Sequence, residues 1–292
     1  MEKIDAHVHV FDKLSDEFPR KVNRLAPPDR EAKAEQLLRE MDAAGISRTV
    51  LIGYGGTGIE HHRYATHCVQ NWPDRFTTTG LVDVDDPDPG ARLKELVEAT
   101  GIKGVRLREV LGEPTAERPE DLKAYGLFQC ADELGVNINI YTKATQVPCI
   151  EMLVRAFPNV NVSLDHYGIS PATPMVADRF RRPRFDDEPI PPSTFPQIID
   201  LAKYPNVYVK ISGEYAFSKV PWPYEDMKPM AEQLYAVYGA ERLMWATDFP
   251  WIAEEPGYQK LVELIDHHLP AISKAEKAMI MGGTAKKIWF KR

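Results

Sequence analysis

Three cysteines are few for a chain of 292 residues, and long apolar runs are absent. Cys68, Cys130 and Cys149 are too scattered for a disulfide framework or a zinc ribbon, so we expect buried, reduced thiols. No apolar run approaches the ~20 residues that span a bilayer. The first residues, MEKIDAHVHVFD, lack the basic start and apolar stretch of a signal peptide. These absences predict a cytoplasmic protein that has no membrane partner.

Basic residues do not outnumber acidic ones. The chain has 36 Lys and Arg against 43 Asp and Glu, which gives a formal net charge of -7. Electrostatic binding of nucleic acid needs a basic surface, so no nucleic-acid partner is expected. A hydrophobic content of 43% is ordinary for a globular protein, and the length allows one large domain or two small ones.

Short segments rich in β-branched residues alternate with segments of helical periodicity. The predicted strands begin at Ile4, Arg48, Phe76, Gly101, Val136, Asn159, Val207 and Arg242. Their spacing is close to the ~31 residues per unit of a (β/α)8 barrel. The sequence therefore predicts a single α/β domain over residues 1–292, a (β/α)8 TIM barrel that is either regular or distorted.

A doubly wound open sheet is the alternative fold, because it also joins parallel strands by helical crossovers. The glycine-rich fingerprint of that fold is missing after the first strand. The closed barrel is therefore preferred.

Three connections are longer than a minimal barrel needs. They follow the first, sixth and seventh predicted strands and cover residues 12–30, 169–193 and 213–226. Because each one follows a strand, all three should lie at the C-terminal rim, where barrel enzymes build their active sites. We expect them to be substrate lids rather than decoration.

Alternation in the first strand separates polar from apolar residues. Asp5, His7 and His9 share one face. The outer face of a barrel strand packs on helices, so we expect these three residues inside the barrel. The residues expected outside are Ile4, Ala6, Val8 and Val10.

Other strands also place polar residues on the face expected inside. The inward positions predicted for the fourth, fifth and seventh strands are Arg106, Arg108, Asn137, Asn139, Tyr141, Lys210 and Ser212. In the sixth strand, alternation does not choose between Asp165 and His166 as the residue that serves a site. The eighth strand ends in Asp248. Buried charge requires partners or water, so these polar strand ends are expected to line a site.

The His-x-His pair at residues 7 and 9 places two imidazoles on one side of a strand, roughly 7 Å apart at Cβ, where they could share one metal. A hydrogen-bonded pair in the core is the alternative. Taken with Asp5, the two inward arginines, His166 and Asp248, the pair becomes more specific. The set offers nitrogen ligands, carboxylates and cations around one mouth.

Several motifs resemble the amidohydrolase-2 branch of the amidohydrolase superfamily. They are IDAHVHVFD, SLDHYG, VKISG, WATDFPW and MGGTAKKIWF, and they run from residue 4 to about residue 290. The resemblance implies that His7, His9 and Asp248 surround the reaction centre. It also implies that the DH pair contributes His166 rather than Asp165. These four residues are then both the expected catalytic residues and the expected metal ligands.

The fifth strand departs from the commoner pattern of that superfamily. Many members have a metal-binding histidine there, but this strand ends in Tyr141, Thr142 and Lys143. The departure resembles the lactonase group, which includes 2-pyrone-4,6-dicarboxylate lactonases and sugar-acid lactonases. The resemblance implies one divalent metal, Zn²⁺ or Mn²⁺, or no metal, and argues against a binuclear centre.

The sequence thus predicts a hydrolase that opens a lactone or a related carboxylic ester, with a carboxylated lactone as its small-molecule partner. Water would be activated by Asp248, by a mononuclear metal or by both. Arg106 and Arg108 would clamp a substrate carboxylate. Tyr141 would donate a hydrogen bond, and Lys143 or Lys210 would add charge, although Lys210 fits a structural ion pair equally well.

Two other functions stay open at this stage. One is a metal-dependent decarboxylase of an aromatic or muconate-type acid, although the fifth-strand histidine expected for that group is missing. The other is a barrel that binds a small molecule without catalysis. The sequence is compatible with a homo-oligomer and does not identify the exact substrate.

Overall fold

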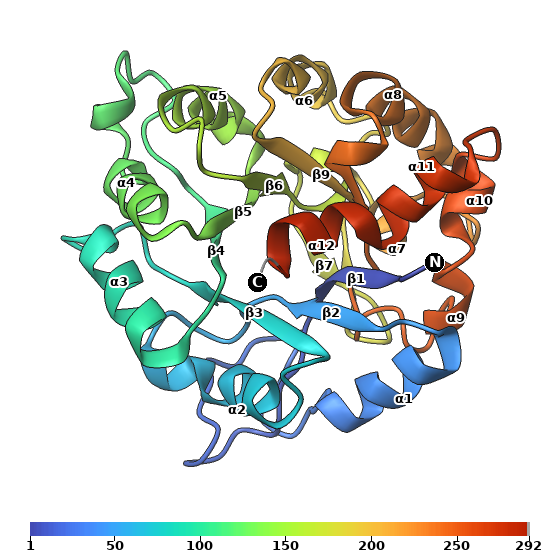
Figure 1. The fold of residues 1–292 in the computed structure, drawn as a ribbon, viewed down its shortest axis with the longest axis horizontal. Helices are drawn as coiled ribbons and strands as arrows, with labels where there is room; N and C mark the ends of the chain where they lie inside the picture. Colours follow the sequence, from blue (N-terminus) through green and yellow to red (C-terminus); the bar gives the residue numbers. More distant parts are fainter. Residues whose placement is uncertain (291–292) are drawn as a thin grey trace.

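The eight predicted strands form one ring of parallel strands (Figure 1). The computed structural model describes residues 1–290, without the side chain of Glu109, and residues 291 and 292 of the predicted domain lie outside the described residues. Hydrogen bonds join the strands in the order β1-β2-β3-β4-β5-β6-β9-β10. Their bounds are Ile4–Val8 (β1), Arg48–Leu51 (β2), Phe76–Leu81 (β3), Gly104–Glu109 (β4), Asn137–Thr142 (β5), Val162–Leu164 (β6), Val207–Ile211 (β9) and Leu243–Trp245 (β10).

Backbone hydrogen bonds close the ring between its first and last strands. The amide of Asp248 donates to the carbonyl of His7 at 2.9 Å, and the amide of His9 donates to the carbonyl of Phe249 at 2.6 Å. An open sheet would leave these two strands at opposite edges. The predicted (β/α)8 barrel is therefore confirmed, and its closure lies next to the predicted site residues.

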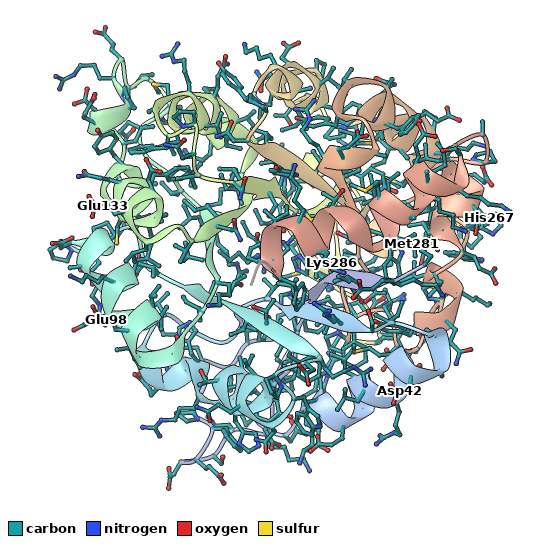
Figure 2. All side chains as sticks on the ribbon, viewed as in Figure 1. Asp42, Glu98, Glu133, His267, Met281 and Lys286 are labelled. Atoms are coloured by element: carbon teal, nitrogen blue, oxygen red, sulfur yellow. The ribbon has the colours of Figure 1, made fainter. Side chains whose placement is uncertain are left out.

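Most of the helices surround the ring (Figure 1) and present charged residues to solvent. Their bounds are Ala34–Ala44 (α1), Arg63–Asn71 (α2), Pro89–Thr100 (α3), Tyr125–Leu134 (α4), Val147–Ala156 (α5), Phe195–Asp200 (α6), Glu214–Phe217 (α7), Lys228–Tyr238 (α8), Tyr258–Leu261 (α9), Leu264–His268 (α10), Lys274–Ala278 (α11) and Thr284–Trp289 (α12). Asp42, Glu98 and Glu133 lie at the periphery on α1, α3 and α4 (Figure 2). Within residues 1–290, no helix has both the length and the apolar character needed to cross a bilayer.

The C-terminal helix α12 lies across the middle of the ring in the view of Figure 1. Its Ile288 and Trp289 pack in the interior core with Val50 and Met244. The side-chain amide of Asn137 donates to the carbonyl of Ile288 at 2.9 Å. This helix therefore fills one end of the barrel and leaves the other end for a site.

An irregularity in β1 changes which of its residues face inward. The register between β1 and β2 shifts between Asp5 and Val8, as happens when a bulge accommodates an extra residue. Ile4 and Ala6 pack in the interior core, whereas Val8 packs in the outer core. The predicted outward positions of Ile4 and Ala6 are therefore wrong, because the bulge reverses the alternation ahead of His7.

Asp5 is the other exception to the predicted faces. Its carboxylate accepts hydrogen bonds from the amide and hydroxyl of Thr247, at 3.0 and 2.6 Å, and from the hydroxyl of Tyr258 in α9 at 2.8 Å. The amide of His7 donates to it as well. Asp5 therefore joins β1 to the segment after β10 and to an outer helix, and it does not face the site.

We expect Asp5→Asn to destabilise the fold by about 2–4 kcal/mol. The hydrogen-bond donors around Asp5 now use both carboxylate oxygens, and the amide of asparagine offers them only one acceptor oxygen. Urea unfolding followed by circular dichroism would measure this. Asp74→Asn, at an exposed position, is the matched control and should leave stability within about 0.5 kcal/mol of the parent. Equal stability of the two variants would contradict the role of Asp5.

Candidate active site

A cavity of about 570 Å³ opens at the carboxyl ends of the strands. Its floor includes His9, His166 and Asp248, which follow β1, β6 and β10. Each of the three long connections contributes to the walls, with Leu25, Met175 and Phe217 respectively. The prediction that all three connections meet at one rim is therefore confirmed.

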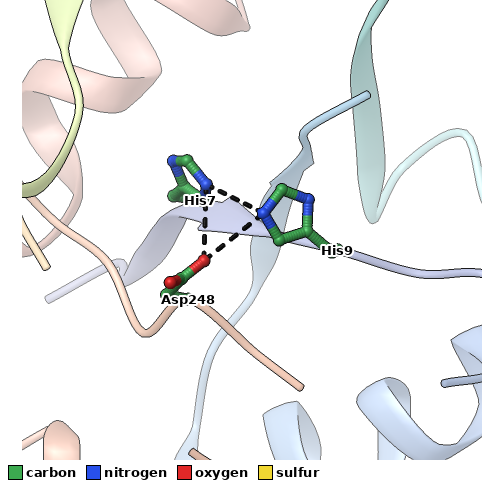
Figure 3. A group of neighbouring side chains, drawn as sticks. All are labelled: His7, His9 and Asp248. Atoms are coloured by element: carbon green, nitrogen blue, oxygen red, sulfur yellow. Dashed lines mark hydrogen bonds and ion pairs between the residues drawn. The ribbon is translucent and has the colours of Figure 1, made fainter. Parts of the chain in front are cut away.

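Three ligand atoms converge at this floor (Figure 3). Nε2 of His7 lies 3.2 Å from Nε2 of His9, and each of these nitrogens lies 3.4 Å from Oδ1 of Asp248. The side chains are buried. The sequence separates Asp248 from the histidines by more than two hundred residues, and barrel closure brings them together.

The donor and acceptor pattern of these atoms fits a divalent cation. Nδ1 of His9 lies 3.0 Å from the carbonyl of Ile52, so its proton sits on Nδ1 and a lone pair remains on Nε2. Nδ1 of His7 lies 3.2 Å from Oδ1 of Asp165, which favours the same tautomer. Oδ1 of Asp248 has no hydrogen-bond partner among the described residues. Two histidines and a carboxylate, with such outer partners, are a common zinc donor set.

The backbone at His166 and Asp248 adopts a strained conformation that places both side chains at the site. Their φ angles are 52° and 60°, and that of Tyr167 is 59°, in the left-handed region that costs about 1 kcal/mol or more for ordinary residues. This turn lets both Asp165 and His166 face the site. Nε2 of His166 lies 3.8 Å from Oδ2 of Asp248, and its Nδ1 lies 3.0 Å from the hydroxyl of Ser212. Whether His166 also ligates a metal stays a prediction.

Asp165 connects the histidine site to two cations. It is 1% exposed, and it lies 2.9 Å from Nζ of Lys210, 2.9 Å from Nε of Arg106 and 3.2 Å from Nδ1 of His7. The resemblance favoured His166 over this residue, so sequence reasoning left Asp165 out of the site. Strand alternation had left both residues open, and the adjacent Asp-His pair in the sequence was the signal that could have retained Asp165.

Burial and neighbouring charges shift the pKa values of Asp165, His7 and His166. Burial acts to raise the pKa of Asp165, but Lys210, His7 and Arg106 outweigh burial and hold that pKa well below the ordinary value. Burial lowers the pKa of His7 well below its ordinary value, and it also lowers the pKa of His166. Both imidazoles are therefore neutral at pH 7, as metal ligands and hydrogen-bond acceptors must be.

Asp248 also stays ionised in this environment. Burial acts to raise its pKa, but His166, His9 and His7 lower it below the ordinary carboxyl value. The hydroxyl of Tyr215 donates to Oδ2 of Asp248 at 2.7 Å. Tyr215 follows VKISG on the long seventh connection, and its sequence context gave no sign of this role.

Four of the predicted substrate-binding residues line the cavity. Arg106, Arg108, Tyr141 and Lys143 all lie on its wall at the ends of β4 and β5. Lys210 is fully buried beneath the floor in its ion pair with Asp165. Of the two roles that the sequence left open for Lys210, the structure displays the ion pair.

A family model described as amidohydrolase matches residues 4–291. The chain belongs to the amidohydrolase family. The family resemblance of its strand motifs is thereby confirmed, and the match extends over nearly the entire sequence.

Relatives of this amidohydrolase with described activities are distant. A 4-sulfomuconolactone hydrolase from Hydrogenophaga intermedia is 25% identical over 247 residues, covering 84% of this chain and 74% of the relative. An L-fucono-1,5-lactonase from Burkholderia ambifaria is 23% identical over 253 residues, covering 85% and 80%. An uncharacterized protein from Sinorhizobium fredii is 26% identical over 180 residues, and the match spans 59% of this chain and only 55% of that protein.

Solved structures share the fold at low identity. A protein from Pseudomonas putida that is described by similarity as a 2-pyrone-4,6-dicarboxylic acid hydrolase has a TM-score of 0.74 at 22% identity, covering 99% of this chain and 97% of that one. A zinc-bound amidohydrolase from Burkholderia multivorans has a TM-score of 0.73 at 18% identity with complete coverage of both chains. A 5-carboxyvanillate decarboxylase from Sphingomonas paucimobilis has a TM-score of 0.66 at 17% identity, covering 100% and 99%. The barrel alone therefore does not distinguish hydrolase from decarboxylase.

We expect Asp165→Asn to weaken zinc binding about 10- to 100-fold, because it removes the carboxylate that orients His7. The variant should also be less stable, since Lys210 loses its buried counter-ion. Competition with a chromophoric chelator would measure zinc affinity. Ser163→Ala is the control on the same strand, where the hydroxyl bonds Asn139, and it should keep parental affinity. Parental affinity in Asp165→Asn would contradict the positioning role.

Zinc or manganese added to the amidohydrolase should bind at one ion per chain, and His9→Ala should lower the affinity at least about tenfold by removing a ligand. Elemental analysis after dialysis would measure the bound metal. His67→Ala, at an exposed position on α2, is the matched control and should retain the parental amount. Equal metal content in all three proteins would place the ion elsewhere.

Proposed function

We propose that this amidohydrolase hydrolyses a lactone or a related carboxylic ester that also carries a carboxylate group. The observation that carries the proposal is Asp248, a buried carboxylate whose Oδ1 faces two imidazole nitrogens at the floor of the cavity. Because this carboxylate is ionised, it can accept a proton from water. The relatives described as a sulfomuconolactone hydrolase and a fuconolactonase support a lactone as the substrate.

The reaction joins the oxygen of water to the carbonyl carbon and breaks the ring C–O bond, so that a carboxylate and a hydroxyl group form. Asp248 accepts the proton of the attacking water at Oδ1, while Tyr215 holds Oδ2. His166 lies beside Oδ2, takes this proton from Asp248 and passes it to the departing ring oxygen. One proton of water thus ends on the new hydroxyl group, and the other is released when the new carboxylic acid ionises.

A divalent metal, Zn²⁺ or Mn²⁺, held by His7, His9 and Asp248, supplies Lewis acidity at this floor when bound. The contacts of His9 with Ile52 and of His7 with Asp165 hold the imidazoles in the required orientation. His166 stays available for proton transfer, because Ser212 fixes its other ring nitrogen.

The substrate carboxylate is assigned to the wall formed by the ends of β4 and β5. Arg106, Arg108 and Lys143 lie there together, and guanidinium groups suit carboxylates through paired hydrogen bonds. The hydroxyl of Tyr141 is the neutral donor of the same wall. Burial raises its pKa above the ordinary tyrosine value, so Tyr141 stays protonated at neutral pH and acts only as a donor.

Lactone hydrolysis should be detectable as acid release with a pH indicator, using a panel of carboxylated lactones. Asp248→Asn should lower kcat/KM at least about 100-fold, because the amide does not accept the proton of water. Asp74→Asn is the matched control, and circular dichroism would check that both variants fold. Carbon dioxide release from aromatic acids, without acid release from lactones, would overturn the proposal in favour of decarboxylation.

A further inference from the structure

Two neighbouring walls of the cavity differ in chemical character. The connection after β6 and the end of α7 contribute apolar residues, which are Pro171, Ala172, Pro174, Met175, Phe185 and Phe217. We refer to these six residues as the apolar wall. The cations of the cavity lie on the neighbouring wall at the ends of β4 and β5. A bound molecule therefore meets charge on one side and hydrocarbon on another.

Contacts between its own residues hold the apolar wall in place. The rings of Phe185 and Phe217 stack with centroids 5.0 Å apart and an interplanar angle of 9°. The amide of Phe185 donates to the carbonyl of Ala216 at 2.8 Å, which joins the sixth and seventh connections. The wall is thus part of the folded structure, and little ordering is needed when a ligand binds.

Glu188 fixes the other part of the wall. It is 1% exposed, and its Oε2 accepts hydrogen bonds from the amides of Ala172 and Thr173 and from the hydroxyl of Thr173, each at 2.9 Å. A buried carboxylate that receives three donors orients the turn between Pro171 and Met175. The apolar side chains of this turn therefore face the cavity in a defined arrangement.

Besides the apolar wall, a pair of aromatic rings lies next to His9 at the floor. Tyr54 and Trp251 line the cavity with centroids 5.9 Å apart, and each also packs near His9. Arg30 covers Trp251 at 5.0 Å from its ring centroid. Apolar or aromatic surface therefore faces the reaction floor from more than one direction.

We propose that the substrate is a carboxylated lactone with an apolar substituent, such as a phenyl ring, that packs on the apolar wall. This inference rests on the proposed function and narrows it. Hydroxyl groups of a sugar lactone would lose water against this wall without gaining partners, which costs binding energy for each unpaired group. A phenyl substituent would instead remove apolar surface from water. The volume of about 570 Å³ lies within the range of sites that hold ligands of more than one ring.

The experiment compares three lactones: a γ-butyrolactone carboxylate, the same compound with a phenyl substituent, and a sugar-acid 1,4-lactone. The phenyl compound should have a kcat/KM about 10- to 100-fold above that of the unsubstituted compound. The sugar lactone should be the poorest substrate. A sugar lactone that is turned over fastest, with loss of activity in Asp248→Asn, would overturn the apolar substituent and leave the lactonase proposal intact.

Met175→Gln tests the wall directly, because Met175 is 39% exposed and its replacement should not disturb the fold. It should lower kcat/KM for the phenyl compound about 3- to 10-fold more than for the unsubstituted compound. Leu134→Gln on α4, with a side chain 38% exposed, is the matched control and should change neither value. An equal effect of Met175→Gln on both compounds would count against the wall.

Calorimetric binding of the ring-opened products separates this inference from the proposed function. The phenyl-substituted hydroxy acid should bind more tightly than a sugar acid, and Met175→Gln should weaken only the former. If this pattern appears although no lactone is hydrolysed, the proposed reaction is wrong while the apolar wall still selects the ligand. Equal binding of both acids would overturn the wall itself.

Discussion

The buried carboxylate of Asp165 is the interaction on which the site depends. Lys210 and Arg106 would otherwise bring two positive charges into the barrel interior, and burial of unpaired charge is costly. With Asp165 between them and His7 at its other contact, the same group balances charge and orients an imidazole. One residue thereby couples the cation wall of the cavity to the histidine floor.

The site also depends on closure of the barrel. The hydrogen bonds between the segments after β1 and β10 align His7, His9 and Asp248, and Asp5 strengthens the same junction from outside the ring. The bulge in β1 is what allows Asp5 to serve the junction while the histidines face the floor. Stability and site geometry are therefore joined at one seam of the barrel.

The floor and the apolar wall of the cavity come from different parts of the amidohydrolase fold. Strand ends supply the histidines and Asp248, whose positions are set by the ring and by two left-handed backbone turns. Connections supply the apolar wall, and they are the segments that differ most readily between proteins of one fold. This division explains why structures described as hydrolases and as a decarboxylase share the barrel, and why the selection of substrate must be sought in the walls.

The sequence by itself determined the eight strands and the barrel, because the alternation of strand and helix patterns is a local property of the chain. Its motifs indicated the family, and the resemblance to that family indicated His7, His9, His166 and Asp248 at the floor. The sequence also predicted Arg106, Arg108, Tyr141 and Lys143 as substrate-binding residues, and the structure places these four on one wall of the cavity. Only the tertiary structure decided the bulge in β1, the buried place of Lys210, and the roles of Asp165 and Tyr215. Those depend on contacts between residues far apart in the chain, and no local pattern encodes which buried charges meet or which hydroxyl reaches a distant carboxylate.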